Sequence, residues 1–347
     1  MGGIDILDEL GKEQILESSD SNLELSDSQL EYLKEFEISP KEWRELSDEQ
    51  KGEVIHDIRN RLEEINVNRF IEQDKVIKEA YNTEMLGEFR KQVCQEKMGQ
   101  LDNLNNAAQL SLEDLKSECP ELFEQVQRMD SRLGNNNPDG IMNTMVYARL
   151  ENGDVVAYST HEAYSNSKMV YSDGTIFARS GGSLKGDNNL NEFINTTELV
   201  PDTEYVIDGR SIYEVDSQGR VFKESTVYTS DYDTKLERST DNQAMIRNGK
   251  DGLENDESSH TVPKCLGGPN EAINQTPMLS DINHGEGSDW AGTERKLTVA
   301  TEQEKISFVK HFFHYDGDSK RPSSVDCYCV IGEELPLSLS FNNLESE

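Results

Sequence analysis

The residues best suited to chemistry lie between Arg238 and Glu294. This segment contains His260, two asparagines at Asn274 and Asn283, several carboxylates and a scatter of glycines. A phosphodiester hydrolase needs a base that deprotonates water and a metal ion that neutralises charge on the phosphate oxygens and the leaving group. The metal needs an oxygen ligand that leaves it mostly hydrated, a role that suits Mg²⁺. His260 could be the base and Asn283 the oxygen ligand.

The spacing of these residues follows a known motif. His260 stands where the motif has a general base, residues 274–277 read Asn-x-x-Pro, and Asn283 and Glu294 follow. In these positions the sequence resembles the DNA/RNA non-specific endonuclease family, in which a two-stranded hairpin feeds a helix around one divalent ion. The resemblance implies that Asn283 is the metal ligand and that Glu294 steadies metal-bound water. It covers about residues 201–343.

Two upstream residues extend the resemblance. Arg238 and Gln243 match an Arg and a Gln of a bacterial branch of the family. By this resemblance Arg238 is catalytic and meets the substrate phosphate, as His260 and Glu294 are catalytic, while Gln243 and Asn274 bind substrate. The implied activity is metal-dependent hydrolysis of phosphodiester bonds in DNA and/or RNA, with little sequence specificity and with Mg²⁺ or Mn²⁺ as cofactor.

The sequence departs from the family at two places. Ser258 and Ser259 stand where relatives have glycine or arginine before the histidine, which could change how the backbone approaches phosphate. Extra residues, three of them glycines, separate Asn283 from Glu294, so an unbroken helix between them is not expected. These departures motivate an alternative, a catalytically weak or inactive binding or scaffold protein with a nuclease fold.

Some of the residues also have simpler interpretations. Asn274 could cap the helix or turn that follows it, and Arg238 could only pair with a nearby carboxylate. His284 is interpreted as incidental, because it would point to a different helix face from Asn283.

The cysteines raise the possibility of a structural zinc site. Cys327 and Cys329 are two apart in a strand-like run, and Cys265 with His260 could complete a tetrahedral set. The spacing is not a usual zinc pairing, so we favour buried strand cysteines.

The elements that must position these residues change along the chain. Residues 1–134 are predicted to be an acidic helical region, with N-terminal caps at 28–31 and 47–50 and a helix from Ser111 to about Leu133. Residues 135–195 are predicted to be a connecting region rich in β-hairpins, and residues 196–347 an endonuclease-like domain. The predicted fold class is therefore α+β.

Period-two hydrophobic patterns predict the strands. Turn residues such as Asn152-Gly153 and Asp173-Gly174 join the first two pairs. The predicted strands cover residues 146–150, 155–158, 169–171, 175–178, 204–207, 211–215, 220–224, 308–315 and 325–331.

The charge argues against an ordinary nucleic-acid binder. The chain has 68 acidic and 34 basic residues and a net charge of -34, and residues 201–347 alone hold 28 acids and 14 bases. Because carboxylates repel phosphates, a nuclease with this composition must depend on a local cationic cluster, for which Arg238, Arg247 and Lys250 are the candidates. We expect loose binding that weakens as salt rises.

The sequence also suggests partners and a location. Its apolar runs are too short to span a bilayer, so no membrane partner is expected, and the N-terminus lacks the features of a secretory signal. We expect a cytoplasmic protein as synthesised, or one exported without a classical signal peptide. Relatives in the bacterial branch suggest an antibacterial toxin, with an immunity or inhibitor protein as a partner and residues 1–134 as an adaptor.

Overall fold

The computed structural model describes residues 40–47, 50–51, 54, 92–100, 107–133, 144–181, 190–229, 240–284, 288–331 and 337–344. The chain divides into two compact units, residues 1–78 and 79–347. In the first unit, α3 (Pro40–Glu45) precedes the predicted cap at 47–50. There the Ser47 N–H donates to Gln50 Oε1 (2.9 Å) and the Gln50 N–H donates to Ser47 Oγ (3.3 Å), which confirms this cap. The cap predicted at 28–31 lies outside the described residues.

The second unit begins with two helices where the sequence predicted one. These are α5 (Leu112–Glu118) and α6 (Pro120–Leu133). The predicted helix start at Ser111 is confirmed, and Ser111 caps the helix: its hydroxyl accepts the Asp114 N–H and the Asp114 side chain accepts the Ser111 N–H. The helix breaks before Pro120, because proline has no N–H to continue the ladder but is well suited to the first turn of a new helix. No helix in the described ranges is long and apolar enough to cross a membrane.

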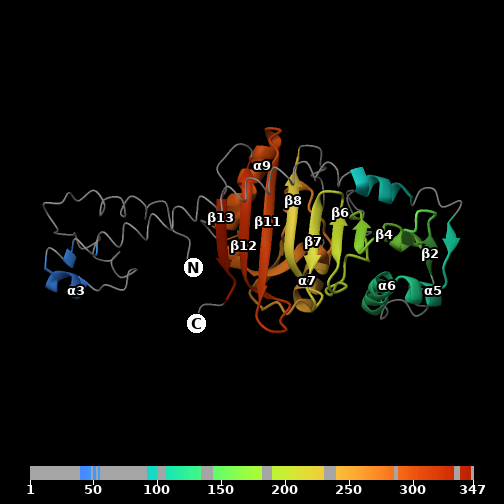
Figure 1. The fold of residues 1–347 in the computed structure, drawn as a ribbon, viewed down its shortest axis with the longest axis horizontal. Coiled ribbons are helices and arrows are strands. Elements are labelled where there is room, and N and C mark those ends of the chain that lie inside the picture. The colour runs from blue at the N-terminus through green and yellow to red at the C-terminus, as the bar shows by residue number, and fades with distance from the viewer. Residues whose placement is uncertain are drawn as a thin grey trace. The chain divides into compact units, whose positions relative to one another are not determined.

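A large sheet forms the body of the second unit (Figure 1). In spatial order its strands are β1 (Ala108–Gln109), β2 (Met145–Arg149), β3 (Val155–Ser159), β4 (Lys168–Ser172), β5 (Thr175–Ala178), β6 (Glu204–Ile207), β7 (Ser211–Val215), β8 (Val221–Tyr228), β11 (Ser307–Tyr315), β12 (Pro322–Ile331) and β13 (Leu337–Asn342). All neighbours are antiparallel except β5 and β6, which are parallel. A short 3₁₀ helix, η4 (Glu162–Tyr164), joins β3 to β4.

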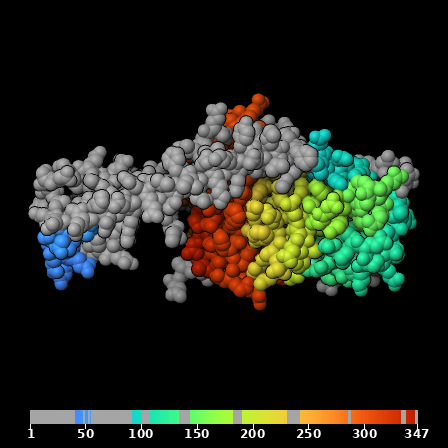
Figure 2. Space-filling model, viewed as in Figure 1, coloured from blue at the N-terminus to red at the C-terminus, as the bar shows by residue number. Residues whose placement is uncertain are grey.

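Strands from both sides of residue 195 therefore belong to one sheet. Figure 2 shows the face on which β8 and the C-terminal strands β11 and β12 lie side by side, in agreement with the β8–β11 pairing. The domain boundaries at 134/135 and 195/196 remain predictions, but the pairing of β5 with β6 crosses the second of them. The predicted strand pattern and the α+β class are confirmed.

A second, two-stranded sheet lies among helices. β9 (Asp256–His260) pairs with β10 (Gln275–Leu279), and the loop between them contains η5 (Lys264–Leu266) and η6 (Ala272–Asn274). β10 runs directly into α8 (Ser280–His284), after which α9 (Asp289–Glu302) packs on β11 and β12. α7 (Thr240–Gly249) packs on both β9 and β10.

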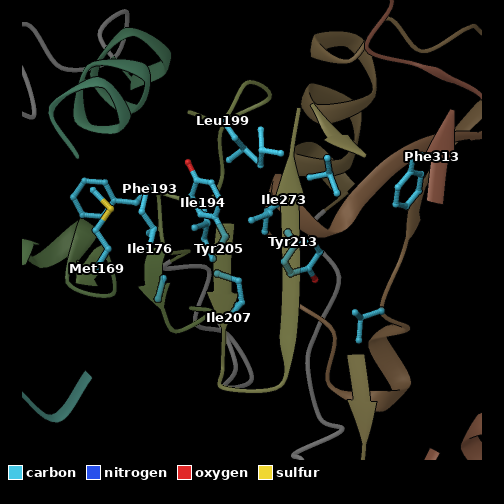
Figure 3. Close-up of a cluster of buried hydrophobic side chains, with 14 of the residues drawn as sticks. Met169, Ile176, Phe193, Ile194, Leu199, Tyr205, Ile207, Tyr213, Ile273 and Phe313 are labelled. Carbon is cyan, nitrogen blue, oxygen red and sulfur yellow. The ribbon is translucent and has the colours of Figure 1, made fainter. Parts of the chain in front are cut away.

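The hydrophobic core joins the predicted connecting region to the predicted nuclease region (Figure 3). Phe193 and Ile194 are fully buried beside Tyr205, and Ile273 of the β9–β10 loop belongs to the same cluster. The Ile273 N–H also donates to the Ile194 carbonyl (3.1 Å). The loop that carries candidate site residues is thus held by a core that begins before residue 195.

Candidate active site

The β9–β10 hairpin brings a strand and a short helix together through their side chains. Ser259 Oγ donates to Asn283 Oδ1 (2.8 Å), and Asn283 Nδ2 donates to Glu257 Oε2 (2.8 Å). α8 follows β10 without a loop, and β10 pairs with β9. Asn283 on α8 therefore lies close to β9, beside the residues that precede His260. The predicted metal ligand and the predicted base therefore share one small region.

A cavity of about 330 Å³ opens at this region. Four of the predicted site residues line it, and each comes from a different element: Gln243 from α7, His260 from β9, Asn283 from α8 and Glu294 from α9. Glu257, Ser258, Arg247, Lys264 and His284 also line it. Arg238 lies outside the described residues, so its predicted role remains a prediction.

His260 is largely buried at the wall of the cavity, with 7% of its surface exposed. Its Nε2 lies 3.4 Å from Asn270 Oδ1, a long contact. Asn270 is therefore placed to orient the ring of the candidate base.

Asn274 does not reach the cavity. It is fully buried, and its Oδ1 accepts bonds from the Tyr213 hydroxyl (2.9 Å) and the Val262 N–H (2.8 Å). Its Nδ2 donates to the carbonyls of Val262 and Pro269, both at 3.0 Å. With its hydrogen-bonding groups used within the protein, we assign Asn274 a positioning role in the β9–β10 loop in place of the predicted substrate contact.

The glycines of this loop are required by its path. Gly267 has φ +76°, and a Cβ added to Gly268 would lie 1.8 Å from the Val262 carbonyl oxygen. Arg210, from the β6–β7 turn, donates to the carbonyls of Leu266 (2.7 Å) and Gly267. The Gly-Gly-Pro sequence between His260 and Asn274 thus serves close packing of the loop against the main sheet.

A buried ion pair fixes the start of β9. Arg321 at the β12 end donates through Nε and Nη2 to the two carboxylate oxygens of Asp256, at 2.5 and 2.8 Å. Asn343 donates to the carbonyls of Pro277 (3.1 Å) and Pro322 (2.8 Å), which ties β10 to the same place. Both strands of the small sheet are therefore anchored to the main sheet.

The predicted cationic cluster is only partly present. Arg247 lines the cavity, and its Nη1 donates to the Asp256 carbonyl (3.2 Å). Lys250 does not line the cavity, and its ammonium donates to the carbonyls of Ala272 (2.7 Å) and Gln275 (2.6 Å). Burial lowers the pKa of Lys250 to about 7. Lys264, which the sequence did not single out, is a cation at the cavity wall.

The expectation that His284 points to a different helix face from Asn283 is wrong. His284 Nε2 lies 2.8 Å from Glu257 Oε2 and 3.0 Å from Asn283 Nδ2, and it lines the cavity. The prediction assigned the two neighbouring side chains to different faces of a helix, but His284 is the last residue of α8 and its side chain lies beside that of Asn283. Glu257 was also missed, although an acidic residue three positions before a candidate base is a usable signal.

Glu294 reaches the cavity from a separate helix. α9 begins after Ser288, whose hydroxyl accepts the Ala291 N–H (3.3 Å), so α8 and α9 are distinct. The expected break between Asn283 and Glu294 is confirmed.

The cysteines do not form the alternative zinc set. Cys327 and Cys329 are buried in β12, as favoured from the sequence, while Cys265 is exposed. Within the described ranges, no group of three or more His, Cys, Asp or Glu residues is arranged to hold a metal. The donors that could hold one are Asn283 Oδ1, the Glu257 carboxylate and His284, a set suited to a hydrated divalent ion.

Comparisons with known proteins found similar structures and a matching family. Two solved structures resemble parts of the chain. "Structure of Sda1 nuclease with bound zinc ion" has 13% identity and a TM-score of 0.30, and covers 39% of this chain and 74% of that one. An "extracellular endonuclease" has 14% identity and a TM-score of 0.29, and covers 38% of this chain and 76% of that one. No curated protein sequence matches the chain. Residues 201–332, which include His260, Asn283 and Glu294, match the family described as DNA/RNA non-specific endonuclease, so this part of the chain is a nuclease domain of that family.

Proposed function

We propose that the protein is a metal-dependent endonuclease that cleaves DNA and/or RNA with little sequence specificity. One observation carries the proposal: His260, Asn283, Glu294 and Gln243 come from four separate elements and line one cavity. Residues that only served packing would have no reason to converge on a polar opening in this way.

His260 acts as the general base. The His260 ring lines the cavity, and its imidazole can take a proton from water beside a phosphate there. The ring is mostly buried, so its orientation is set by the surrounding protein. Glu294, on helix α9, lines the same cavity, which supports a role for its carboxylate in holding water.

Asn283 and Glu257 supply hard oxygen atoms that would hold a divalent ion, and the proposed cofactor is Mg²⁺ or Mn²⁺. When bound, the ion neutralises charge on the phosphate oxygens and the leaving group. Ser259 supports this role because its hydroxyl bonds the Asn283 amide and holds that side chain at the cavity. Arg247 and Lys264 add positive charge for the phosphate, and the position of Gln243 at the cavity wall supports a contact with substrate.

The serines that prompted the inactive-scaffold alternative fit an active site. Ser259 holds Asn283, as described above. Ser258 lines the cavity, and its buried Oγ has no hydrogen-bond partner among the described residues. A buried hydroxyl without a partner at a cavity wall is suited to a ligand or an ordered water. This favours an active enzyme over the scaffold alternative.

The test is cleavage of supercoiled plasmid and of single-stranded RNA by the full chain, with Mg²⁺ or Mn²⁺ and with EDTA. His260→Ala should lower the rate by about 10² to 10⁴, the usual contribution of a general base, while the circular dichroism spectrum stays unchanged. His314→Ala is the control, because His314 is an exposed histidine bonded to Asp326 (2.8 Å). Metal-dependent cleavage that persists at the full rate in His260→Ala would remove the assigned base.

A further inference from the structure

Three polar atoms at the edge of the cavity form a small triangle. Glu257 Oε2 lies 2.8 Å from Asn283 Nδ2 and 2.8 Å from His284 Nε2. The third side, between Asn283 Nδ2 and His284 Nε2, is 3.0 Å. These atoms come from β9 and α8, two elements already held together by the Ser259–Asn283 bond.

The triangle has the dimensions of one face of a metal coordination sphere. In an octahedral ion with bonds of about 2.1 Å, neighbouring ligand atoms are about 3.0 Å apart. A half-turn of the Asn283 amide about its Cβ–Cγ bond exchanges Oδ1 and Nδ2. The amide oxygen then completes the triangle, and Nδ2 becomes a donor to Ser259 Oγ, which can accept a hydrogen bond as well as donate one.

We propose that His284 is a third protein ligand and that Glu257, Asn283 and His284 form a facial oxygen, oxygen and nitrogen set that favours a first-row transition ion such as Mn²⁺ over Mg²⁺. Imidazole is a poor partner for Mg²⁺, which prefers oxygen and keeps most of its waters, whereas transition ions bind mixed nitrogen and oxygen sets. The inference rests on the proposed metal-dependent function and narrows the identity of the metal.

A simple surface ion pair does not account for the arrangement. His314 and Asp326 form such a pair at the same 2.8 Å, and His314 is 52% exposed, against 53% for His284. His314 belongs to β11 and does not line the cavity. His284 differs in having both a carboxylate and an amide at ligand spacing, at the wall of the cavity that holds the candidate base.

The experiment measures metal ligation without measuring cleavage. Mn²⁺ alone is titrated into the full chain and followed by electron paramagnetic resonance, and the bound ion is examined by electron spin echo modulation for a directly bound imidazole nitrogen. Competition with Mg²⁺ alone gives the relative affinity. The variants are His284→Ala and the matched control His314→Ala.

The expected result is an imidazole nitrogen coupling in the native protein and in His314→Ala that is lost in His284→Ala. We also expect His284→Ala to weaken Mn²⁺ binding by about tenfold or more and to weaken Mg²⁺ binding much less. Bound Mn²⁺ with no nitrogen coupling, or a coupling that survives in His284→Ala, overturns the inference while plasmid cleavage through His260 can still stand. Absence of Mn²⁺ binding overturns the inference as well. If the protein then still cleaves nucleic acid in EDTA, the proposed metal dependence of the enzyme is wrong but its nuclease activity is not.

Discussion

A buried carboxyl group in the β9–β10 loop should make the stability of the protein fall as pH rises toward neutrality. Glu271 is fully buried, and its Oε1 accepts the N–H groups of Gly181 (2.7 Å) and Asn191 (2.9 Å). Its Oε2 has no hydrogen-bond partner among the described residues. Burial is the main cause that raises the pKa of Glu271 from 4.5 to about 7, and the charge of Asp208 adds to the rise.

The size and sign of the effect follow from this shift. Between pH 4.5 and 7 the folded protein keeps a proton on Glu271 that the unfolded chain has lost. The free energy of unfolding therefore has its full contribution below about pH 4.5 and loses it as pH rises to about 7. At 1.36 kcal/mol per pH unit the loss is on the order of 3 kcal/mol.

The variant Glu271→Gln isolates this effect. Glutamine keeps an acceptor oxygen for the two N–H groups but cannot ionise. Urea unfolding of both proteins from pH 4.5 to 7 should show the native protein losing roughly 3 kcal/mol relative to the variant, since other titrating groups cancel in the difference. Above pH 7 the stability of each protein should rise again, because Lys250 has its pKa lowered to about 7 and acts in the opposite sense.

Glu302→Gln, an exposed position at the end of α9, is the control for loss of one carboxylate. A difference between native protein and Glu271→Gln that does not change with pH would refute the reasoning, because it would mean that the Glu271 charge is solvated in the folded protein. A change of the opposite sign would show that the two N–H bonds outweigh burial.

Three further changes test the residues that hold or line the walls of the cavity. Arg321→Met should cost about 3–5 kcal/mol in urea unfolding by leaving Asp256 buried and unpaired, and the double variant with Asp256→Leu should recover much of it. Gly268→Ala should disrupt the loop and cleavage, whereas Gly292→Ala, whose Cβ meets nothing closer than 3.8 Å, should not. A bulky maleimide should label the exposed Cys265 before the other described cysteines and block cleavage, and Cys265→Ser should prevent the block.

Local patterns were sufficient to predict most of the strands and caps. Each predicted strand depended on a period of two and on turn residues such as Asn152-Gly153, which act over a few residues. The Ser111 cap depended on an Asp three residues later. Long-range pairings were not predictable in this way, and the parallel β5–β6 contact and the core shared by Ile194 and Ile273 are examples.

The same distinction between local patterns and long-range contacts applies to the site residues. His260 and Asn283 could be found because their types and spacing carry the chemistry, and both line the cavity. Burial decided the cases that failed. Asn274 and Lys250 have suitable side chains for substrate, but the fold uses their polar groups to bind carbonyls and N–H groups inside the protein. His284 was underestimated because where α8 ends depends on packing and could not be read from its neighbours.

The acidic charge of the protein sets a limit on how it can hold a polymer substrate. The chain carries a net charge of -34. Lys250 does not line the cavity and Arg238 is outside the described residues, so Arg247 and Lys264 are the Arg and Lys residues that line it among the described residues. Each phosphate contact contributes about -0.9 to the slope of log affinity against log salt, so two contacts give roughly -2. A fourfold rise in salt should then weaken binding only about tenfold.

Fluorescence anisotropy of a labelled DNA duplex with the His260→Ala protein can measure this slope without cleavage. Arg247→Ala should reduce its magnitude by about 1, since one phosphate contact is lost. A slope much steeper than about -4 would show that cations away from the cavity track the phosphate backbone. In that case the local cavity would not explain binding, and the acidic composition would be a poor guide to how this nuclease meets its substrate.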